Sequence, residues 1–154
     1  MLPGELESLL SPADYDSAKR TTFNAFYTSP EVIQSMHDAL TRLGVPKSGT
    51  ILEPGCGVGN FLSQASKDAH SIGVELDRTS GAIAQAIHPE HDIRVENFRD
   101  TRLAENSLDA VIGNVPFANI KLEHRGHRFA LHDYFFAKSM DALKPGGTMA
   151  LVTS

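Results

Sequence analysis

A glycine-rich loop that follows a short apolar segment limits the folds that this chain can adopt. Residues 50–52 are predicted to form a buried strand, and they lead directly into the motif Glu-Pro-Gly-Cys-Gly-Val-Gly-Asn at 53–60. Glycines at every second position let the backbone turn sharply and let a ligand approach where a Cβ atom would collide. With an amphipathic helix expected at 61–69, the segment forms the strand, loop and helix unit of a layered α/β fold.

The rest of the chain alternates between helical and extended patterns. A helix capped by Ser29 and Pro30 is predicted up to Gly44, a second helix is marked by apolar residues at 82, 83, 86 and 87, and a third ends at about 143. Further strands are predicted at 71–75, 92–95, 108–113 and 148–153. The alternation implies a parallel sheet with flanking helices, in which ligands bind beyond the carboxyl ends of the strands.

The length of 154 residues suits one domain. We expect a helical leader at 1–23 and the main domain at 24–154, truncated after its fifth strand, so that the chain is a fragment of a longer protein. There is no run of about 18 apolar residues and no signal-peptide pattern. A soluble, cytoplasmic chain without a membrane partner is therefore expected.

The single cysteine, Cys56, lies between two loop glycines, where a small residue is needed. We interpret it as a packing residue rather than a nucleophile or a metal ligand, and one cysteine cannot form an internal disulfide. His124 and His127 are also candidate metal ligands. Without a second cysteine or a helical pattern of histidine and carboxylate, they are predicted to lie in a solvated loop. The sequence thus predicts no metal site.

The formal net charge is −5. This is the wrong sign for a chain that grips nucleic acid through phosphates alone, because such binding depends on cationic contacts. One basic cluster, formed by Lys121, Arg125 and Arg128, could contact phosphates or could be an ordinary charged loop. The residues leave both interpretations open.

Glu75 indicates what the glycine loop binds. It ends the second predicted strand, 20 residues after Gly55, where an acid can accept hydrogen bonds from both hydroxyls of a ribose. A nicotinamide dinucleotide would use the same pair, but its pattern places the third glycine at the position of Asn60. Glu53 could face the amino group and sulfonium of S-adenosylmethionine, so we favour this methyl donor.

The segment Asn114-Val115-Pro116-Phe117 follows the fourth predicted strand. The amine of an adenine-type base is a poor nucleophile, and two acceptors on its hydrogens would aim its lone pair at the methyl group. The Asn114 side chain and the Val115 carbonyl can be these acceptors, while Phe117 can stack on the base for about 1–3 kcal/mol. The alternative is a turn that ends the strand and places Phe117 in the core.

These motifs resemble those of the amino-methyltransferases that act on adenine in DNA, in the gamma-type order. The resemblance runs from Asn24 to Ser154 and implies a Rossmann-like methyltransferase fold. It further implies that Thr28 contacts the methionine part of the cofactor, that Leu76 lies beside its adenine, and that Asn97 binds the adenine amine. The implied catalytic residues are Asn114, Val115, Pro116 and Phe117, and the cofactor-binding residues are Tyr27, Thr28, Glu53, Pro54, Gly55, Cys56, Gly57, Gly59, Glu75, Leu76, Asn97, Phe98 and Asn114.

Two departures from the family pattern bear on function. Val115 replaces a proline, so the backbone is less restricted there, and Asn97 replaces an aspartate. The segment with Val115, together with the stretch His-Asp-Tyr-Phe-Phe-Ala-Lys-Ser at 132–139, is most similar to the methylase part of phage and plasmid methylase-helicase proteins. This implies DNA as a partner, bound weakly by this chain alone, with recognition and helicase domains elsewhere. The alternatives are an RNA adenine or a protein glutamine as acceptor, or a non-catalytic module within a helicase or antirestriction protein.

Overall fold

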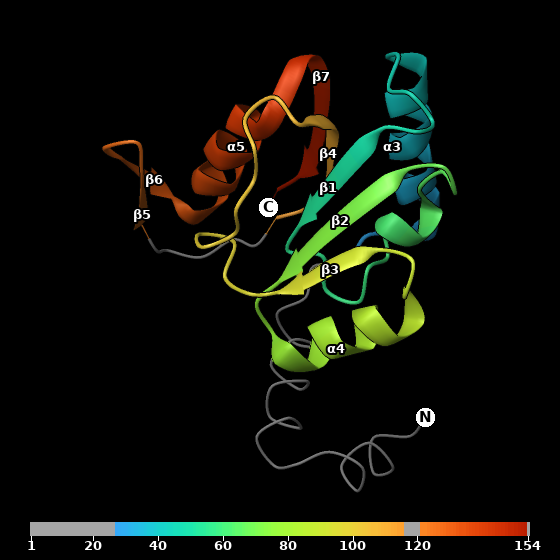
Figure 1. Ribbon diagram of the computed structural model, residues 1–154, viewed down its shortest axis with the longest axis horizontal. Helices are drawn as coiled ribbons and strands as arrows, with labels where there is room; N and C mark the ends of the chain where they lie inside the picture. The colour runs from blue at the N-terminus through green and yellow to red at the C-terminus, as the bar shows by residue number, and fades with distance from the viewer. Residues whose placement is uncertain (1–26, 116–120, 154) are drawn as a thin grey trace, which may run out of the picture.

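The computed structural model describes residues 27–115 and 121–153, and their fold is a parallel sheet between two layers of helices (Figure 1). The predicted leader at 1–23 lies outside these residues. The sheet has five strands in the order β3-β2-β1-β4-β7. The bounds of these strands are β1 (Thr50–Pro54), β2 (His70–Glu75), β3 (Asp92–Val95), β4 (Leu108–Asn114) and β7 (Leu143–Val152). The α/β fold class predicted from the alternating patterns is confirmed.

The strand order reverses at β1, which pairs with β2 on one side and with β4 on the other. Glu53 aligns with Gly73 of β2, and Glu75 aligns with Val95 of β3. Since all neighbouring strands are parallel, their carboxyl ends meet at one edge of the sheet. In open α/β sheets this edge, at the point of reversal, is the place for a ligand.

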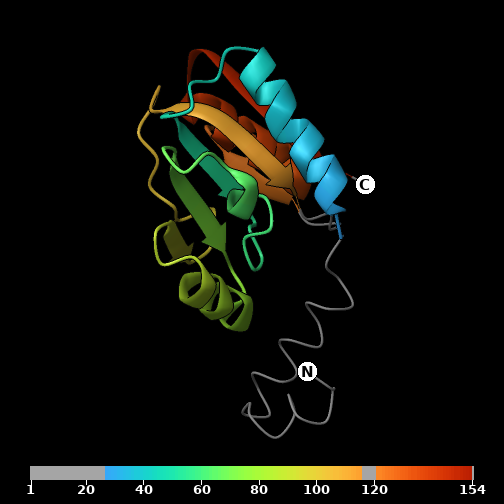
Figure 2. The ribbon, with the colours of Figure 1, turned by 90° about the vertical axis from the view of Figure 1, so that its right-hand side faces the viewer.

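Alternating side chains of the central strands pack in two core layers. Ile51 faces the helix α3 (Pro30–Arg42), whereas Leu52 faces the helix α5 (Leu131–Ala142). The helix α4 (Arg78–Ile87) lies over β2 and β3, where Ala84 joins a small cluster with Ile93. Figure 2 shows α3 crossing one face of the sheet, with α5 behind it. None of the helices in the described part of the chain is both long and apolar enough to cross a membrane.

The start of α3 agrees with the sequence prediction. Ser29 is the N-cap, and its Oγ accepts a hydrogen bond from the amide of Val32 at 3.4 Å. Pro30 occupies the first turn, where its missing N–H has no cost. The helix gives way to Gly44, whose φ of 93° few other residues adopt.

The prediction of a helix at 61–69 is wrong. The structure has only the short 3-10 helix η1 (Leu62–Gln64) between β1 and β2. Ser63 Oγ donates to the carbonyl of Asn60 at 2.7 Å, and Ser66 Oγ accepts from the amide of Asp68 at 3.3 Å. Such local bonds from serine compete with a regular helix, which explains why the apolar spacing is not followed here.

The predicted apolar face of α4 is also wrong, although the helix itself is present. Ile83 and Ile87 are exposed, at 43% and 56%, while Gly81 and Ala84 are buried. A Cβ atom on Gly81 would lie 2.6 Å from Val95 Cγ2. The helix therefore approaches β3 through its small residues, because larger ones would not fit.

A third correction concerns the loop expected around His124 and His127. These residues lie in an antiparallel hairpin formed by β5 (Lys121–His124) and β6 (His127–Ala130). The turn residues Arg125 and Gly126 have φ values of 48° and 80°. Positive φ at both positions is typical of the type I′ turn, whose twist matches that of a hairpin. The hairpin packs on α5 and leads into it.

The C-terminal elements differ slightly from prediction. The helix α5 ends at Ala142 rather than at 143, and β7 begins at once and includes the segment 143–147. Gly146 has a φ of 81° within this segment. The strand registers with β4 at Leu143 and again from Thr148 onward, with an irregularity between the two stretches.

Candidate functional site

The candidate site lies at the carboxyl edge of the sheet, where the predicted residues come together from separate strands. Glu53 is the penultimate residue of β1, Glu75 ends β2, and Asn114 ends β4. Asn97 follows β3 by two residues. The topology therefore brings to one edge the groups that the sequence assigned to the methyl donor and to the acceptor.

The glycine loop needs glycine for its backbone conformation. Gly55, Gly57 and Gly59 have φ values of 70°, 55° and 88°, which L side chains rarely adopt. Among the described residues, none has an atom within 4 Å of a Cβ placed on Gly57, apart from the glycine itself and its chain neighbours. The loop therefore has open space beside its backbone, which fits the close approach of a nucleoside.

Glu75 joins this loop to the turn after β2. Its carboxylate accepts hydrogen bonds from the amides of Gly57 and Asp77, each at 2.8 Å. Burial raises the pKa of Glu75, and the bonds from Asp77 and Gly57 oppose that rise. Each carboxylate oxygen can accept more than one bond. The group is thus fixed in place and chemically suited to receive the hydroxyls of a ribose.

Glu53 is the more deeply buried carboxyl, with only 2% of the residue exposed. Its Oε2 accepts from the amide of Leu62 at 3.2 Å. Burial is the main reason that the pKa of Glu53 lies well above its ordinary value, and the nearby charge of Glu75 raises it further. A cationic ligand would offset both effects. The amino group and sulfonium of S-adenosylmethionine are such cations, so these two carboxyls fit that cofactor.

Gly113 brings β4 against this carboxyl. A Cβ atom on Gly113 would lie 3.2 Å from Glu53 Cγ. The residue directly before Asn114 thus lies so close to Glu53 that a side chain there would crowd the acid. This proximity brings the acceptor side of the site next to the cofactor side.

Cys56 packs in the core, as its position between glycines predicted. It clusters with Leu62, Ala84 and Ile93. Its amide donates to the carbonyl of Val74 at 2.8 Å, which fastens the loop to β2. Burial raises the pKa of the thiol, so a reactive thiolate is disfavoured.

Asn114 is held by a residue far away in the sequence. Its Nδ2 donates a hydrogen bond to Thr28 Oγ1 at 3.1 Å. With Nδ2 directed at Thr28, the acceptor that the amide presents is Oδ1. Val115 is buried, and its amide donates to the carbonyl of Val152 at 3.1 Å. The remaining predicted catalytic residues, Pro116 and Phe117, lie outside the described part of the chain.

The Asn97-Phe98 pair is divided between surface and core. Asn97 is exposed, and its Oδ1 accepts from the amide of Arg99 at 3.0 Å, which orients the side chain. Phe98 is buried and stacks on Phe135 with ring centroids 4.7 Å apart. The ring of Phe98 thus packs in the core beside the predicted site, and its contact with a cofactor stays a prediction.

Lys138, which the sequence analysis did not single out, bonds the backbone that follows Asn97. Its ammonium group donates to the carbonyls of Phe98 and Arg99, and lies 5.0 Å from the centre of the Phe98 ring. Burial lowers the pKa of this lysine. A single lysine within an otherwise apolar and small-residue part of α5 is the signal that could have identified it.

Two predicted cofactor residues are large, exposed apolar side chains. Tyr27 is 76% exposed and Leu76 is 67% exposed. Leu76 directly follows Glu75, where the resemblance places the adenine of the cofactor. Exposure leaves these side chains able to cover a ligand, although their contact with one stays a prediction.

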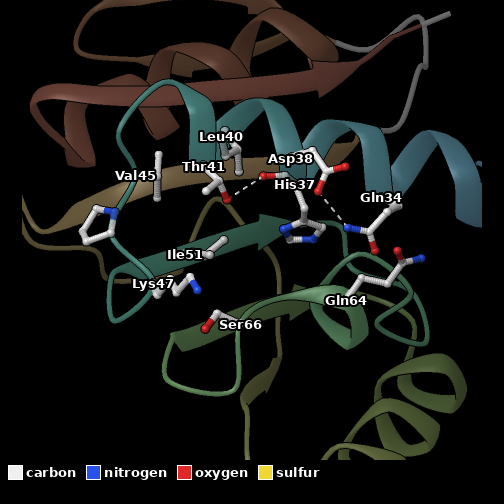
Figure 3. Close-up of a pocket in the computed structure, with 11 residues that line it drawn as sticks. Gln34, His37, Asp38, Leu40, Thr41, Val45, Lys47, Ile51, Gln64 and Ser66 are labelled. Atoms are coloured by element: carbon white, nitrogen blue, oxygen red, sulfur yellow. Dashed lines mark hydrogen bonds between the residues drawn. The ribbon is translucent and has the colours of Figure 1, made fainter.

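A separate hollow of about 290 Å³ lies between α3, the start of β1 and η1 (Figure 3). None of the predicted site residues that the structure describes lines it. Its lining includes the buried His37, whose Nε2 lies 2.7 Å from the carbonyl oxygen of Phe61. Burial lowers the pKa of His37. With its hydrogen on Nε2, His37 donates to this carbonyl and fastens α3 to the end of the glycine loop.

Comparison with known proteins agrees with this geometry. Residues 33–154 match the family described as methyltransferase small domain. Defense against restriction protein B of Escherichia phage P1 is 27% identical over 135 residues, which are 82% of this chain and 6% of that protein. Type II methyltransferase M.CvrRI of Paramecium bursaria Chlorella virus XZ-6E is 30% identical over 102 residues, which are 64% of this chain and 26% of that protein. The chain thus spans only a small part of each relative.

A solved structure supports the fold. Geranyl diphosphate C-methyltransferase from Streptomyces coelicolor A3(2) superposes with a TM-score of 0.57 at 23% identity, over 77% of this chain and 43% of that one. The Rossmann-like fold class is thereby confirmed. The chain belongs to the methyltransferase small domain family, and this match agrees with the methyl donor expected from the sequence.

Proposed function

We propose that this protein transfers a methyl group from S-adenosylmethionine to the exocyclic amine of adenine in DNA. The observation that carries the proposal is the position of Asn114 at the sheet edge, where Thr28 holds it and the preceding Gly113 lies close to Glu53. The similarity to a viral type II methyltransferase gives DNA as the substrate further support.

The residues of the chain divide the work between binding and orientation. Glu75 and the glycine loop would hold the nucleoside part of the cofactor, while Glu53 would face its cationic end. S-adenosylmethionine supplies an electrophilic methyl group on its sulfonium. Asn114 Oδ1 and the Val115 carbonyl would accept hydrogen bonds from the two amine hydrogens, which aims the nitrogen lone pair at that methyl group. Orientation of the amine is thus the main task of the protein.

DNA is the proposed partner, yet the surface of this chain offers it little positive charge. Arg125 of the basic cluster pairs with Glu105 and, at 3.0 Å, with Asp141. Arg128 lies directly opposite Glu123 in the hairpin. These acids compete with phosphate, so we propose that this chain alone binds DNA weakly. Basic segments of another domain would supply the grip.

The acceptor is tested with labelled S-adenosylmethionine and matched substrates. A duplex that contains adenine should become labelled, and digestion should place the label on the adenine amine. The same duplex with its adenines already methylated on that amine is the control and should take up far less label. Labelling of an RNA or of a glutamine peptide, with none on the duplex, would change the acceptor. Cofactor binding without transfer to any substrate would favour a non-catalytic module.

A further inference from the structure

The turn between α4 and β3 brings together three side chains with metal-binding groups. In this turn, His88-Pro89-Glu90-His91, the amide of His91 donates to the carbonyl of His88 at 3.1 Å. Proline at the second position of such a turn fixes φ in advance. The rings of His88 and His91 stack with centroids 5.4 Å apart. The turn therefore holds its first and fourth side chains on the same side before any ligand binds.

The donor atoms are spaced as a transition metal requires. Glu90 Oε1 lies 3.8 Å from His88 Nδ1 and 3.4 Å from His91 Nε2. One donor atom from each residue can be chosen so that all three lie within 4.8 Å of one another. With bonds of about 2.0–2.2 Å, the donors around a tetrahedral zinc ion are roughly 3.4 Å apart. Small side-chain rotations would therefore complete the coordination.

The surroundings of the three donors also suit a bound ion. The side chains of His88 and His91 are 13% and 10% exposed, whereas that of Glu90 is 62% exposed. The two rings are thus held largely out of water, and the carboxylate borders the solvent from which an ion would enter. Two imidazoles and one carboxylate form a donor set that zinc uses, with a water molecule as the fourth ligand.

We propose that His88, Glu90 and His91 bind one zinc-class divalent cation. The ion would also brace the glycine loop, because the other edge of the His88 ring faces that loop. A Cβ atom on Gly59 would lie 2.8 Å from His88 Cδ2 and 3.1 Å from His88 Nε2. A ring fixed by a metal at Nδ1 would keep this contact in place. The site is separate from the carboxyls Glu53 and Glu75, and the inference does not depend on the acceptor of the methyl group.

The test is calorimetric titration of the whole chain, freed of affinity tags and of metal, with Zn²⁺ in the absence of the methyl donor. One ion should bind per chain. Glu90→Gln and His91→Gln should each weaken binding by more than about tenfold, since even residues behind the metal ligands are typically worth about 10- to 100-fold. His70→Gln, at an exposed histidine that starts β2, is the matched control and should bind as the native chain does. Mg²⁺, which prefers oxygen ligands, should not compete.

Thermal unfolding provides a second readout. Zn²⁺ should raise the unfolding temperature of the native chain and of His70→Gln, but not that of Glu90→Gln or His91→Gln. Because Glu90 is exposed, its replacement by glutamine should leave the fold unchanged in a circular dichroism spectrum. An absence of saturable Zn²⁺ binding would mean that Glu90 only forms ion pairs with His88 and His91 and that the three residues bind no metal. Binding that both variants retain would place the ion elsewhere. Either result overturns the proposal.

Discussion

The two sides of the sheet edge hold their functional groups by different means. On the cofactor side, formed by β1, β2 and the glycine loop, backbone amides hold the carboxyls of Glu53 and Glu75. On the acceptor side, at the end of β4, the side chain of Asn114 is held by that of Thr28, 86 residues earlier. The cofactor side is thus formed by neighbouring strands, whereas the acceptor side depends on a contact between distant segments. We expect the two sides to fail separately when mutated.

The largest effect should come from Asn114→Ala on the acceptor side. Methyl transfer to adenine in DNA should fall by about a hundredfold or more, or about 3 kcal/mol, because an oriented hydrogen bond at the reacting amine is lost. Cofactor affinity measured by calorimetry should stay near the native value. Thr28→Val keeps the shape but removes the hydroxyl, and should cause a smaller loss of the same kind. Near-normal transfer by Asn114→Ala would contradict the proposed mechanism.

The next largest effect should come from Glu75→Ala on the cofactor side. Its carboxylate bonds both Gly57 and Asp77 and is predicted to bind a ribose. Hydrogen bonds to a charged group are worth about 1.5–3 kcal/mol, so S-adenosylmethionine affinity should fall by roughly a hundredfold. The far-ultraviolet circular dichroism spectrum should be unchanged. Glu105→Ala, at an exposed acid away from the edge, serves as the control. Undiminished affinity would remove Glu75 from the site.

The predictability of these two sides from the sequence differs for a physical reason. Strand ends, glycine spacing and the acid at 75 are local features, so the cofactor side and the parallel sheet could be predicted. The contact of Asn114 with Thr28 and the burial of Phe98 under α5 are tertiary facts that no local pattern contains. The apolar spacing at 61–69 predicted a helix, but the side chains of Ser63 and Ser66 form hydrogen bonds with nearby backbone groups. Only the short 3-10 helix η1 forms there.

The hairpin β5–β6 was missed because its turn carries Arg125 and Gly126. The usual signals of a type I′ turn are Asn-Gly and Asp-Gly. Only the glycine was present as a signal, and the charges around it suggested a loop. Likewise, the buried face of α4 could not be predicted. The helix packs on the sheet through Gly81 and Ala84, whereas the apolar periodicity predicted that its isoleucines would be buried.

An intermediate effect, dependent on pH, is expected for Glu53→Gln. Because the pKa of Glu53 is raised in the fold, the folded protein holds this proton more tightly than the unfolded chain does. The stability of the native protein should therefore decrease as pH rises above the ordinary value of 4.5, by up to about 1.4 kcal/mol per pH unit, until the raised pKa is passed. Glu53→Gln should lack this component of the pH profile, as measured by urea unfolding across the range.

Cofactor affinity should show the opposite trend at this residue. A cationic ligand favours the ionised carboxylate, so the affinity of the native protein should rise as pH increases through the same range. The rise should be smaller for Glu53→Gln. If the native protein and Glu53→Gln show the same pH dependence of both stability and cofactor affinity, Glu53 is not the group that contacts the cation.

The smallest effect is expected in the hairpin, which we place outside both sides of the edge. Arg125→Ala removes the ion pairs with Glu105 and Asp141 and should lower the free energy of unfolding by less than about 1 kcal/mol, because exposed ion pairs contribute little. Arg125→Asn removes the same pairs but supplies a residue that the type I′ turn prefers, so it should recover most of the loss. Equal destabilisation of the two variants in urea would mean that the ion pairs, rather than the turn, hold the hairpin.

Both variants should bind S-adenosylmethionine as the native protein does. A loss of that binding would show that the hairpin and the cofactor side are coupled, so that the hairpin would not lie outside the edge.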